Sequence, residues 1–202
     1  MPEGVDPRPP HPASPHPPGG EATHALLTLP NLITLARLCA VPATVWLILE
    51  GRMAWAFGLF VAAGLSDGLD GWLARVRNAR SVLGALLDPV ADKALLVSVY
   101  VTLAAVGALP SWVAILVVFR DALILGGIAL LWGVGRPPEI RPLRVSKANT
   151  VLQILLAGAA LAVAGFGLDA GWWFWALMAA TALSTLASGA AYVVQTARCL
   201  AR

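Results

Sequence analysis

The chain has 202 residues, of which 58% are hydrophobic and only 12% are charged, and its net charge is +3. Soluble domains carry about twice this share of charged residues, so the composition excludes an ordinary water-soluble globule. It also excludes disorder over most of the chain, because disorder needs low hydrophobicity and high charge. We therefore expect an all-α, polytopic membrane protein.

The first 22 residues differ from the rest of the chain. Eight of the fifteen prolines fall within the first twenty residues. Pro-rich sequence with little apolar content cannot bury a hydrophobic core. We predict a disordered tail over residues 1–22, followed by one membrane domain over residues 23–202.

Six apolar segments follow this tail, and each is close to the roughly 20 residues that a helix needs to cross a bilayer. They are predicted at Leu32–Leu49, Met53–Val76, Val82–Val106, Trp112–Trp132, Thr150–Phe166 and Trp172–Gln195. Lipid offers no hydrogen bonds to backbone groups, so segments that span it must be helical. The sequence thus predicts a bundle of six transmembrane helices, with an aromatic belt at Trp172, Trp173 and Trp175.

The basic residues of the loops predict the orientation of these spans. With the N-terminus inside, the inner regions hold ten lysines and arginines, whereas the outer loops hold Arg52 alone. Basic loops favour the cytoplasmic side, so we expect both termini in the cytoplasm. The short loops fit a bacterial inner membrane, and a mitochondrial inner membrane stays open as the alternative. The loops lack interleaved aromatic residues, and we expect no nucleic-acid partner.

Four aspartates lie inside the second and third apolar segments, where each carboxylate costs about 2.5–3.5 kcal/mol at a helix centre. Helical spacing places Asp67 and Asp70 on one face, and Asp88 and Asp92 on another. A tight turn between the two segments would bring these faces together near the cytoplasmic surface. Converging carboxylates repel one another unless they are protonated or bridged by cations. All-oxygen ligands suit Mg²⁺, Mn²⁺ or Ca²⁺, and four aspartates suit two such ions.

Small residues share the faces of these aspartates. Gly71 and Ala74 lie on the face of the first pair and Gly84 on that of the second, so we expect them to line a pocket. Arg75 ends the first aspartate face, as a phosphate contact or as an interface anchor. Bridged metals beside arginines at a membrane surface indicate phosphoryl-type chemistry on a lipid or nucleotide. Two alternatives stay open: an ion or lipid transporter that uses the acidic cluster, and a catalytically inactive scaffold.

A signature joins these residues. The run Asp67-Gly68-Leu69-Asp70-Gly71-Trp72-Leu73-Ala74-Arg75 is followed, after eight residues, by Gly84, Asp88 and Asp92 at intervals of four. This pattern resembles that of the CDP-alcohol phosphatidyltransferases, with every fixed position present, and the resemblance covers about residues 28–195. It implies a six-helix membrane bundle, often a homodimer. The implied reaction transfers a phosphatidyl group from CDP-diacylglycerol to an alcohol and releases CMP.

The resemblance also implies roles for individual residues. Asp67, Asp70 and Asp88 would hold two divalent cations, Mg²⁺ or Mn²⁺, while Asp92 would complete the second metal site and act as general base. The nucleotide pocket would be shaped by Gly71, Ala74, Arg75 and Gly84. The entry to the first span would add nucleotide contacts at Asn31, Thr34 and Arg37. A helix cap at Asn31 and an interface anchor at Arg37 are the structural alternatives.

The acceptor alcohol is indicated by two further segments. Phe119-Arg120-Asp121 and Ser146-Lys147-Ala148-Asn149-Thr150 resemble segments of the cardiolipin synthases, whose acceptor is phosphatidylglycerol. Phosphatidylglycerophosphate synthases, which use glycerol 3-phosphate, typically carry Glu and Lys at the positions of Asp121 and Asn149. We favour phosphatidylglycerol and keep glycerol 3-phosphate as the alternative. The predicted acceptor-binding residues are Arg120, Arg141, Arg144, Lys147 and Asn149.

Overall fold

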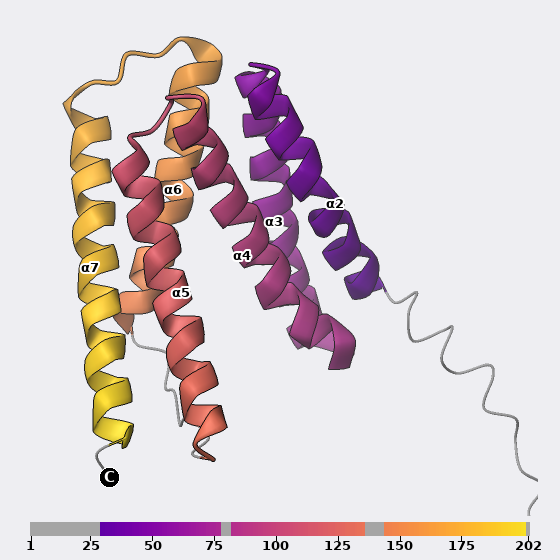
Figure 1. Cartoon of the computed structure of the whole chain (residues 1–202). Helices are drawn as coiled ribbons and strands as arrows, with labels where there is room; N and C mark the ends of the chain where they lie inside the picture. The colour runs from indigo at the N-terminus through magenta and orange to yellow at the C-terminus, as the bar shows by residue number, and fades with distance from the viewer. Residues whose placement is uncertain (1–28, 78–81, 136–143, 201–202) are drawn as a thin grey trace, which may run out of the picture.

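The computed structural model describes the backbone of residues 29–77, 82–135 and 144–200, and the side chains of residues 35–66, 93–131, 133–135 and 145–199. Within these ranges it contains helices and no strands (Figure 1), which confirms the predicted fold class. The helices are α2 (Leu29–Leu49), α3 (Met53–Arg77), α4 (Val82–Ala105), α5 (Ser111–Gly133), α6 (Arg144–Phe166) and α7 (Trp172–Leu200). The predicted tail lies outside the described residues.

Glycines end several helices where the sequence predicted breaks. Gly51, Gly107 and Gly167 follow α2, α4 and α6 with φ angles of 71°, 76° and 63°. A side chain is strained in this left-handed region, whereas glycine adopts it freely and stops the helix. The chain can therefore reverse within a few residues and continue into the next helix of the bundle.

The sequence-based boundaries were wrong at three helix ends, always on the short side. Helix α6 begins at Arg144 rather than Thr150, α7 continues to Leu200 rather than Gln195, and α2 begins at Leu29. Hydropathy marks only the apolar part of a helix. The polar start of α6 is helical, and its side chains have partners on neighbouring helices: Ser146 accepts a hydrogen bond from Arg120 and Asn149 accepts one from Thr185.

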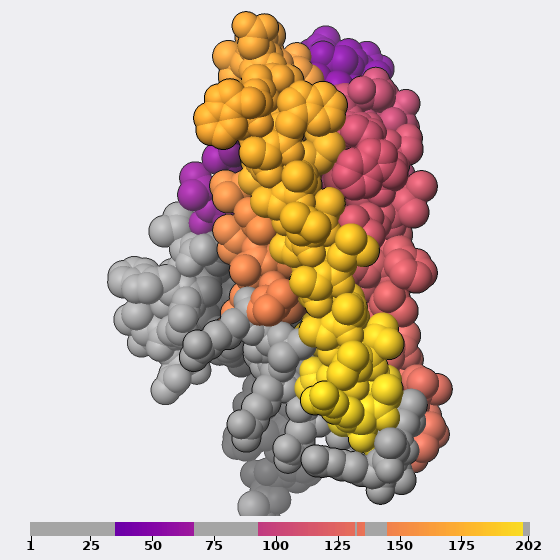
Figure 2. Space-filling view, turned by 90° about the vertical axis from the view of Figure 1, so that its left-hand side faces the viewer, coloured from indigo at the N-terminus to yellow at the C-terminus, as the bar shows by residue number. Residues whose placement is uncertain are grey.

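The helices run up and down, so the start of α2 and the end of α7 lie at the same end of the bundle (Figure 1), here called the inner end. Helix α2 packs against α3 and α4, and α3 packs in turn against α6. Helix α7 packs against α5 and α6, and Figure 2 shows it along one face of the molecule with these two helices on either side. The side-chain core includes Ile48, Val99, Tyr100, Leu103 and Leu161, each fully buried.

Three helices are long and apolar enough to cross a membrane within the described side chains: Ser111–Leu131, Val145–Phe166 and Trp172–Cys199. The apolar parts of α2, α3 and α4 that lie in the described side chains are shorter, at 10–17 residues. At the outer end, opposite the inner one, Trp172, Trp173 and Trp175 are exposed, and so are Trp55 and Trp112 at the starts of α3 and α5. Exposed tryptophans at one level are typical of a membrane interface.

Candidate active site

The signature residues lie on two helices that approach the inner end. Asp67, Asp70 and the small residues after them belong to the last part of α3, and Gly84, Asp88 and Asp92 belong to the first part of α4. The continuous α3 helix keeps positions 67, 70, 71 and 74 on one face, as predicted. All side chains of these positions, with Arg75, lie outside the described residues, so their predicted roles stay predictions.

The metal site cannot be built from other parts of the described chain. Among the side chains that the structure describes, no group of three or more histidines, cysteines, aspartates or glutamates comes together. The donor set of the signature is made of carboxylates alone, which is the chemistry that Mg²⁺ and Mn²⁺ prefer. The four aspartates therefore suit the predicted cations by type of ligand.

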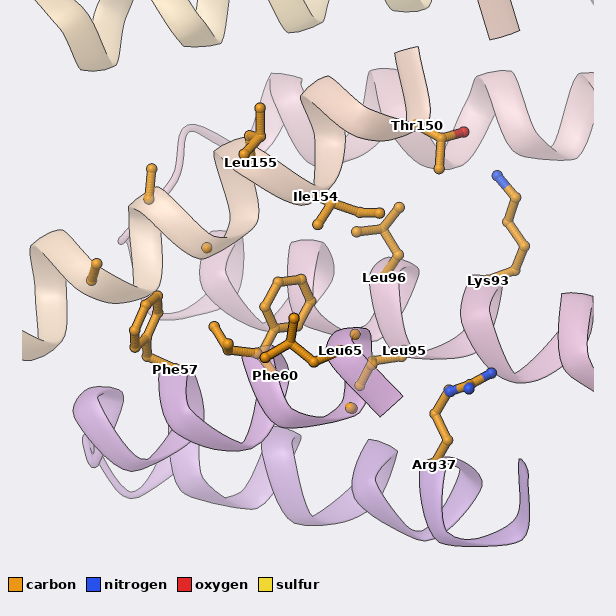
Figure 3. A pocket seen from close by; sticks show the side chains of 16 residues that line it. Arg37, Phe57, Phe60, Leu65, Lys93, Leu95, Leu96, Thr150, Ile154 and Leu155 are labelled. Carbon is orange, nitrogen blue, oxygen red and sulfur yellow. The ribbon is translucent and has the colours of Figure 1, made fainter. Parts of the chain in front are cut away.

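A cavity of about 630 Å³ opens between α3 and α6 and reaches α2 and α4. Most of its lining is apolar, including Phe57, Phe60 and Ile154. Arg37, Lys93 and Thr150 lie together at its inner end (Figure 3). An apolar cavity with cations at one end suits an amphiphile that has a hydrocarbon chain and an anionic head.

Three charged side chains meet inside the bundle beside this cavity, and we call them the ion triad: Lys93, Asp121 and Arg120. Lys93 Nζ lies 2.8 Å from Asp121 Oδ1 and 2.7 Å from Asp121 Oδ2. Arg120 Nη1 donates to Asp121 Oδ1 over 2.6 Å. Arg120 and Asp121, adjacent in the sequence, thus form an ion pair, and Lys93 of α4 is a second partner of Asp121 that was not predicted from the sequence.

Arg120 is held on all sides. Its side chain is 3% exposed, and its guanidinium also donates to Ser146 of α6 and to Ser188 of α7. The ring of Tyr192 lies 6.0 Å from its central carbon. These contacts tie α5 to α6 and α7, so Arg120 has a structural role whatever else it binds.

A row of hydrogen-bonding side chains continues from Arg120 between α6 and α7. We call this row the polar seam: Asn149, Gln153, Thr181, Ser184, Thr185 and Ser188. Asn149 Oδ1 accepts hydrogen bonds from the hydroxyls of Ser184 and Thr185, at 2.7 and 2.8 Å. The hydroxyl groups of α7 were not predicted from the sequence, although their spacing of three and four residues in an apolar segment is a usable signal.

The structure separates the predicted acceptor residues. Arg120 and Asn149 are buried in the ion triad and the polar seam, whereas Lys147 is exposed near the start of α6. Arg141 and the side chain of Arg144 lie outside the described residues. Asn149 therefore faces α7, while its neighbour Thr150 lines the cavity.

Among the first-span residues predicted to contact a nucleotide, Arg37 is the one whose side chain is described. It is 4% exposed and lines the inner end of the cavity. Asn31 and Thr34 belong to α2, but their side chains lie outside the described residues. The position of Arg37 supports a site contact more than an interface anchor.

Comparison with known proteins gives the family. The model of the CDP-alcohol phosphatidyltransferases matches residues 27–193. The chain belongs to this family. Members are generally dependent on divalent cations and use CDP-alcohols and lipid acceptors, so the resemblance carried by the signature is confirmed.

Three relatives illustrate the similarity. The chain is 32% identical to a cardiolipin synthase (CMP-forming) / mitochondrial hydrolase fusion protein of Schizosaccharomyces pombe, over 84% of this chain and 31% of the relative. It is 32% identical to human cardiolipin synthase (CMP-forming), over 82% and 60%. It is 36% identical to the chloroplastic CDP-diacylglycerol–glycerol-3-phosphate 3-phosphatidyltransferase 1 of Oryza sativa subsp. japonica, over 71% and 49%. The chain therefore spans between about a third and three-fifths of the length of these relatives.

Proposed function

We propose that this protein transfers a phosphatidyl group from CDP-diacylglycerol to the hydroxyl group of an acceptor and releases CMP. The observation that carries the proposal is the apolar cavity, whose cationic inner end adjoins the helices that bear the signature. One acyl chain of the donor would occupy the apolar part, with the headgroup toward Arg37 and Lys93. Such a cavity falls in the range of roughly 300–1,000 Å³ typical of ligand sites.

The residues of this chain would divide the work. Asp67, Asp70, Asp88 and Asp92 would hold two divalent cations, which when bound would supply positive charge to neutralise and polarise the pyrophosphate. Asp92 would accept the proton of the acceptor hydroxyl. The acceptor oxygen would then bond to the phosphatidyl phosphorus as the bond from that phosphorus to the CMP oxygen breaks. Gly71, Ala74, Arg75 and Gly84, with Asn31 and Thr34, would enclose the nucleotide.

Phosphatidylglycerol is the favoured acceptor. Asp121 and Asn149, which differ from the pattern of the glycerol 3-phosphate enzymes, are both neutralised or hydrogen-bonded inside the bundle. A relative named as a glycerol-3-phosphate enzyme keeps that acceptor as the second candidate. The phosphate of glycerol 3-phosphate would be bound by cations near the inner end, among Arg120, Arg141, Arg144 and Lys147.

The setting of the site belongs to the same proposal. We place the inner end, both termini and the active site at the cytoplasmic face of a bacterial inner membrane, because the ends of α3, α6 and α7 that carry Arg77, Arg144 and Arg198 lie at that end. Residues 23–202 form the membrane domain and residues 1–22 its tail. The family resemblance favours a homodimer.

The test supplies purified protein with CDP-diacylglycerol and Mg²⁺ or Mn²⁺, and reads CMP and lipid products by mass spectrometry. Parallel reactions contain phosphatidylglycerol or glycerol 3-phosphate. Cardiolipin in the first reaction would support the proposal. Phosphatidylglycerophosphate in the second would mean that glycerol 3-phosphate is the acceptor. Asp92→Asn should abolish turnover in a folded protein, and retained turnover would contradict the role of Asp92 as general base. Ion or lipid flux without CMP release would favour a transporter.

A further inference from the structure

Two cations share one carboxylate in the ion triad. Asp121 accepts hydrogen bonds from both Lys93 and Arg120, so these three side chains carry a net charge of +1 inside the bundle. Among the described side chains no second carboxylate forms an ion pair with Lys93 or Arg120. A charge without a counter-charge among membrane helices is costly, and such charges mark binding sites. The arrangement therefore favours an additional anion next to the triad.

The surplus charge is accessible at Lys93. The Lys93 side chain is 41% exposed and lines the inner end of the cavity, whereas Arg120 and Asp121 are 3% and 7% exposed. Arg120 also donates hydrogen bonds to Ser146 and Ser188. Figure 3 shows Lys93 beyond the apolar lining, at the same end as Arg37. An anion in the cavity would meet the ammonium group of Lys93.

We propose that Lys93 binds the phosphatidyl phosphate of CDP-diacylglycerol, and that Asp121 is the positioning residue that holds its ammonium group at the inner end of the cavity. The inference rests on the proposed function. Lys93 comes one residue after the signature on α4 and lines the inner end of the cavity, so a lipid phosphate bound there would lie at the level of the signature. The Lys93 side chain is flexible, and the Asp121 carboxylate of α5 fixes the position of its ammonium group.

The contact is tested with three lipids that share the same acyl chains: CDP-diacylglycerol, phosphatidic acid and diacylglycerol. Lys93→Met should weaken binding of the first two about tenfold, because each loses a charge-assisted hydrogen bond. Binding of diacylglycerol, which has no phosphate, should not change. Arg52→Met, which removes an exposed cation at the outer end, is the matched control and should bind all three lipids as the wild type does.

Steady-state kinetics separates the donor from the acceptor. Lys93→Met should raise KM for CDP-diacylglycerol about tenfold and leave KM for phosphatidylglycerol unchanged. An increase confined to phosphatidylglycerol would overturn the assignment to the donor. Equal weakening of all three lipids, or of none, would overturn the phosphate contact.

The role of Asp121 is tested by a variant that keeps the charge. Asp121→Glu moves the carboxylate by one methylene, and should raise KM for CDP-diacylglycerol about threefold with the melting temperature preserved. Asp121→Asn should raise KM for CDP-diacylglycerol by a larger factor. Neither change should add to the donor KM when Lys93 is already methionine, since Asp121 acts through it. Additive effects, or a lower melting temperature without a change in donor KM, would overturn the positioning role.

The two proposals can fail separately. If no CMP is released under any condition, the proposed function fails. The preference for phosphatidic acid over diacylglycerol, and its loss in Lys93→Met, then still decides whether Lys93 binds a lipid phosphate.

Discussion

The two sides of α6 have opposite chemistry. The side toward α3 borders a cavity with apolar lining and one closely packed glycine, Gly165. The side toward α7 carries the polar seam, in which Asn149 and Gln153 are fully buried. Both sides belong to the same 23-residue helix, and Asn149 and Thr150 are adjacent in sequence yet lie on different sides.

The two sides of α6 together give this bundle both rigidity and room for a ligand. Hydrogen bonds between buried side chains specify the register of α6, α7 and α5, since each donor needs a partner at one place. An apolar lining offers no such directional contact, so the α3 side can remain open. The seam therefore stabilises α6, and the cavity is the part left free for binding.

Removal of Arg120 is expected to destabilise the α7 side of α6 more than any other change described below. Arg120→Met deletes a buried cation that contacts Asp121, Ser146 and Ser188. Breaking a buried ion pair costs about 3 kcal/mol or more, and Lys93 compensates Asp121 only in part. The free energy of unfolding in mixed micelles measures the loss. Arg52→Met is the exposed control, and an equal loss in both variants would contradict a special role for the triad.

Most of the fold could be predicted from the sequence, because long apolar segments and glycine breaks carry strong signals. The aspartate signature also placed the candidate site on α3 and α4. Local sequence does not predict contacts between distant residues. Nothing in the sequence near Lys93 predicts that its ammonium group donates a hydrogen bond to Asp121, 28 residues away. The early start of α6 was missed for the same reason, since Ser146 is stabilised by Arg120 of another helix.

Gly165 lies near the outer end of α6, on the side that faces α3, and tests how closely these two helices pack there. A Cβ atom at this position would lie 2.5 Å from the backbone nitrogen of Ala54 and 2.8 Å from its Cα. Backbone cannot yield as a side chain can, so Gly165→Ala should force α3 and α6 apart and cost about 2 kcal/mol. Thermal unfolding of the purified protein measures this. An unchanged melting temperature would show that the two helices are not so close.

Loss of Asn149 should have a smaller effect than its complete burial suggests. Asn149→Ala removes the acceptor for Ser184 and Thr185, but both hydroxyls also lie within hydrogen-bond distance of the Thr181 carbonyl oxygen. Each can turn its single hydrogen to that oxygen. We expect a loss of about 1 kcal/mol in the free energy of unfolding. A loss as large as that of Arg120→Met would mean that the seam acts as one cooperative unit.

Gly158 gives the smallest expected change in stability and the sharpest comparison with Gly165. A Cβ atom at Gly158 would meet only Phe60 Cε1, at 3.9 Å, so Gly158→Ala should change the free energy of unfolding by less than about 0.5 kcal/mol. Gly158→Leu should instead extend into the cavity, because this glycine is part of its lining. We expect KM for CDP-diacylglycerol to rise several-fold, with the melting temperature kept, because the leucine side chain would take space that an acyl chain needs. The opposite pattern, a destabilised protein with an unchanged donor KM, would mean that the cavity is a packing defect that the lipid does not enter.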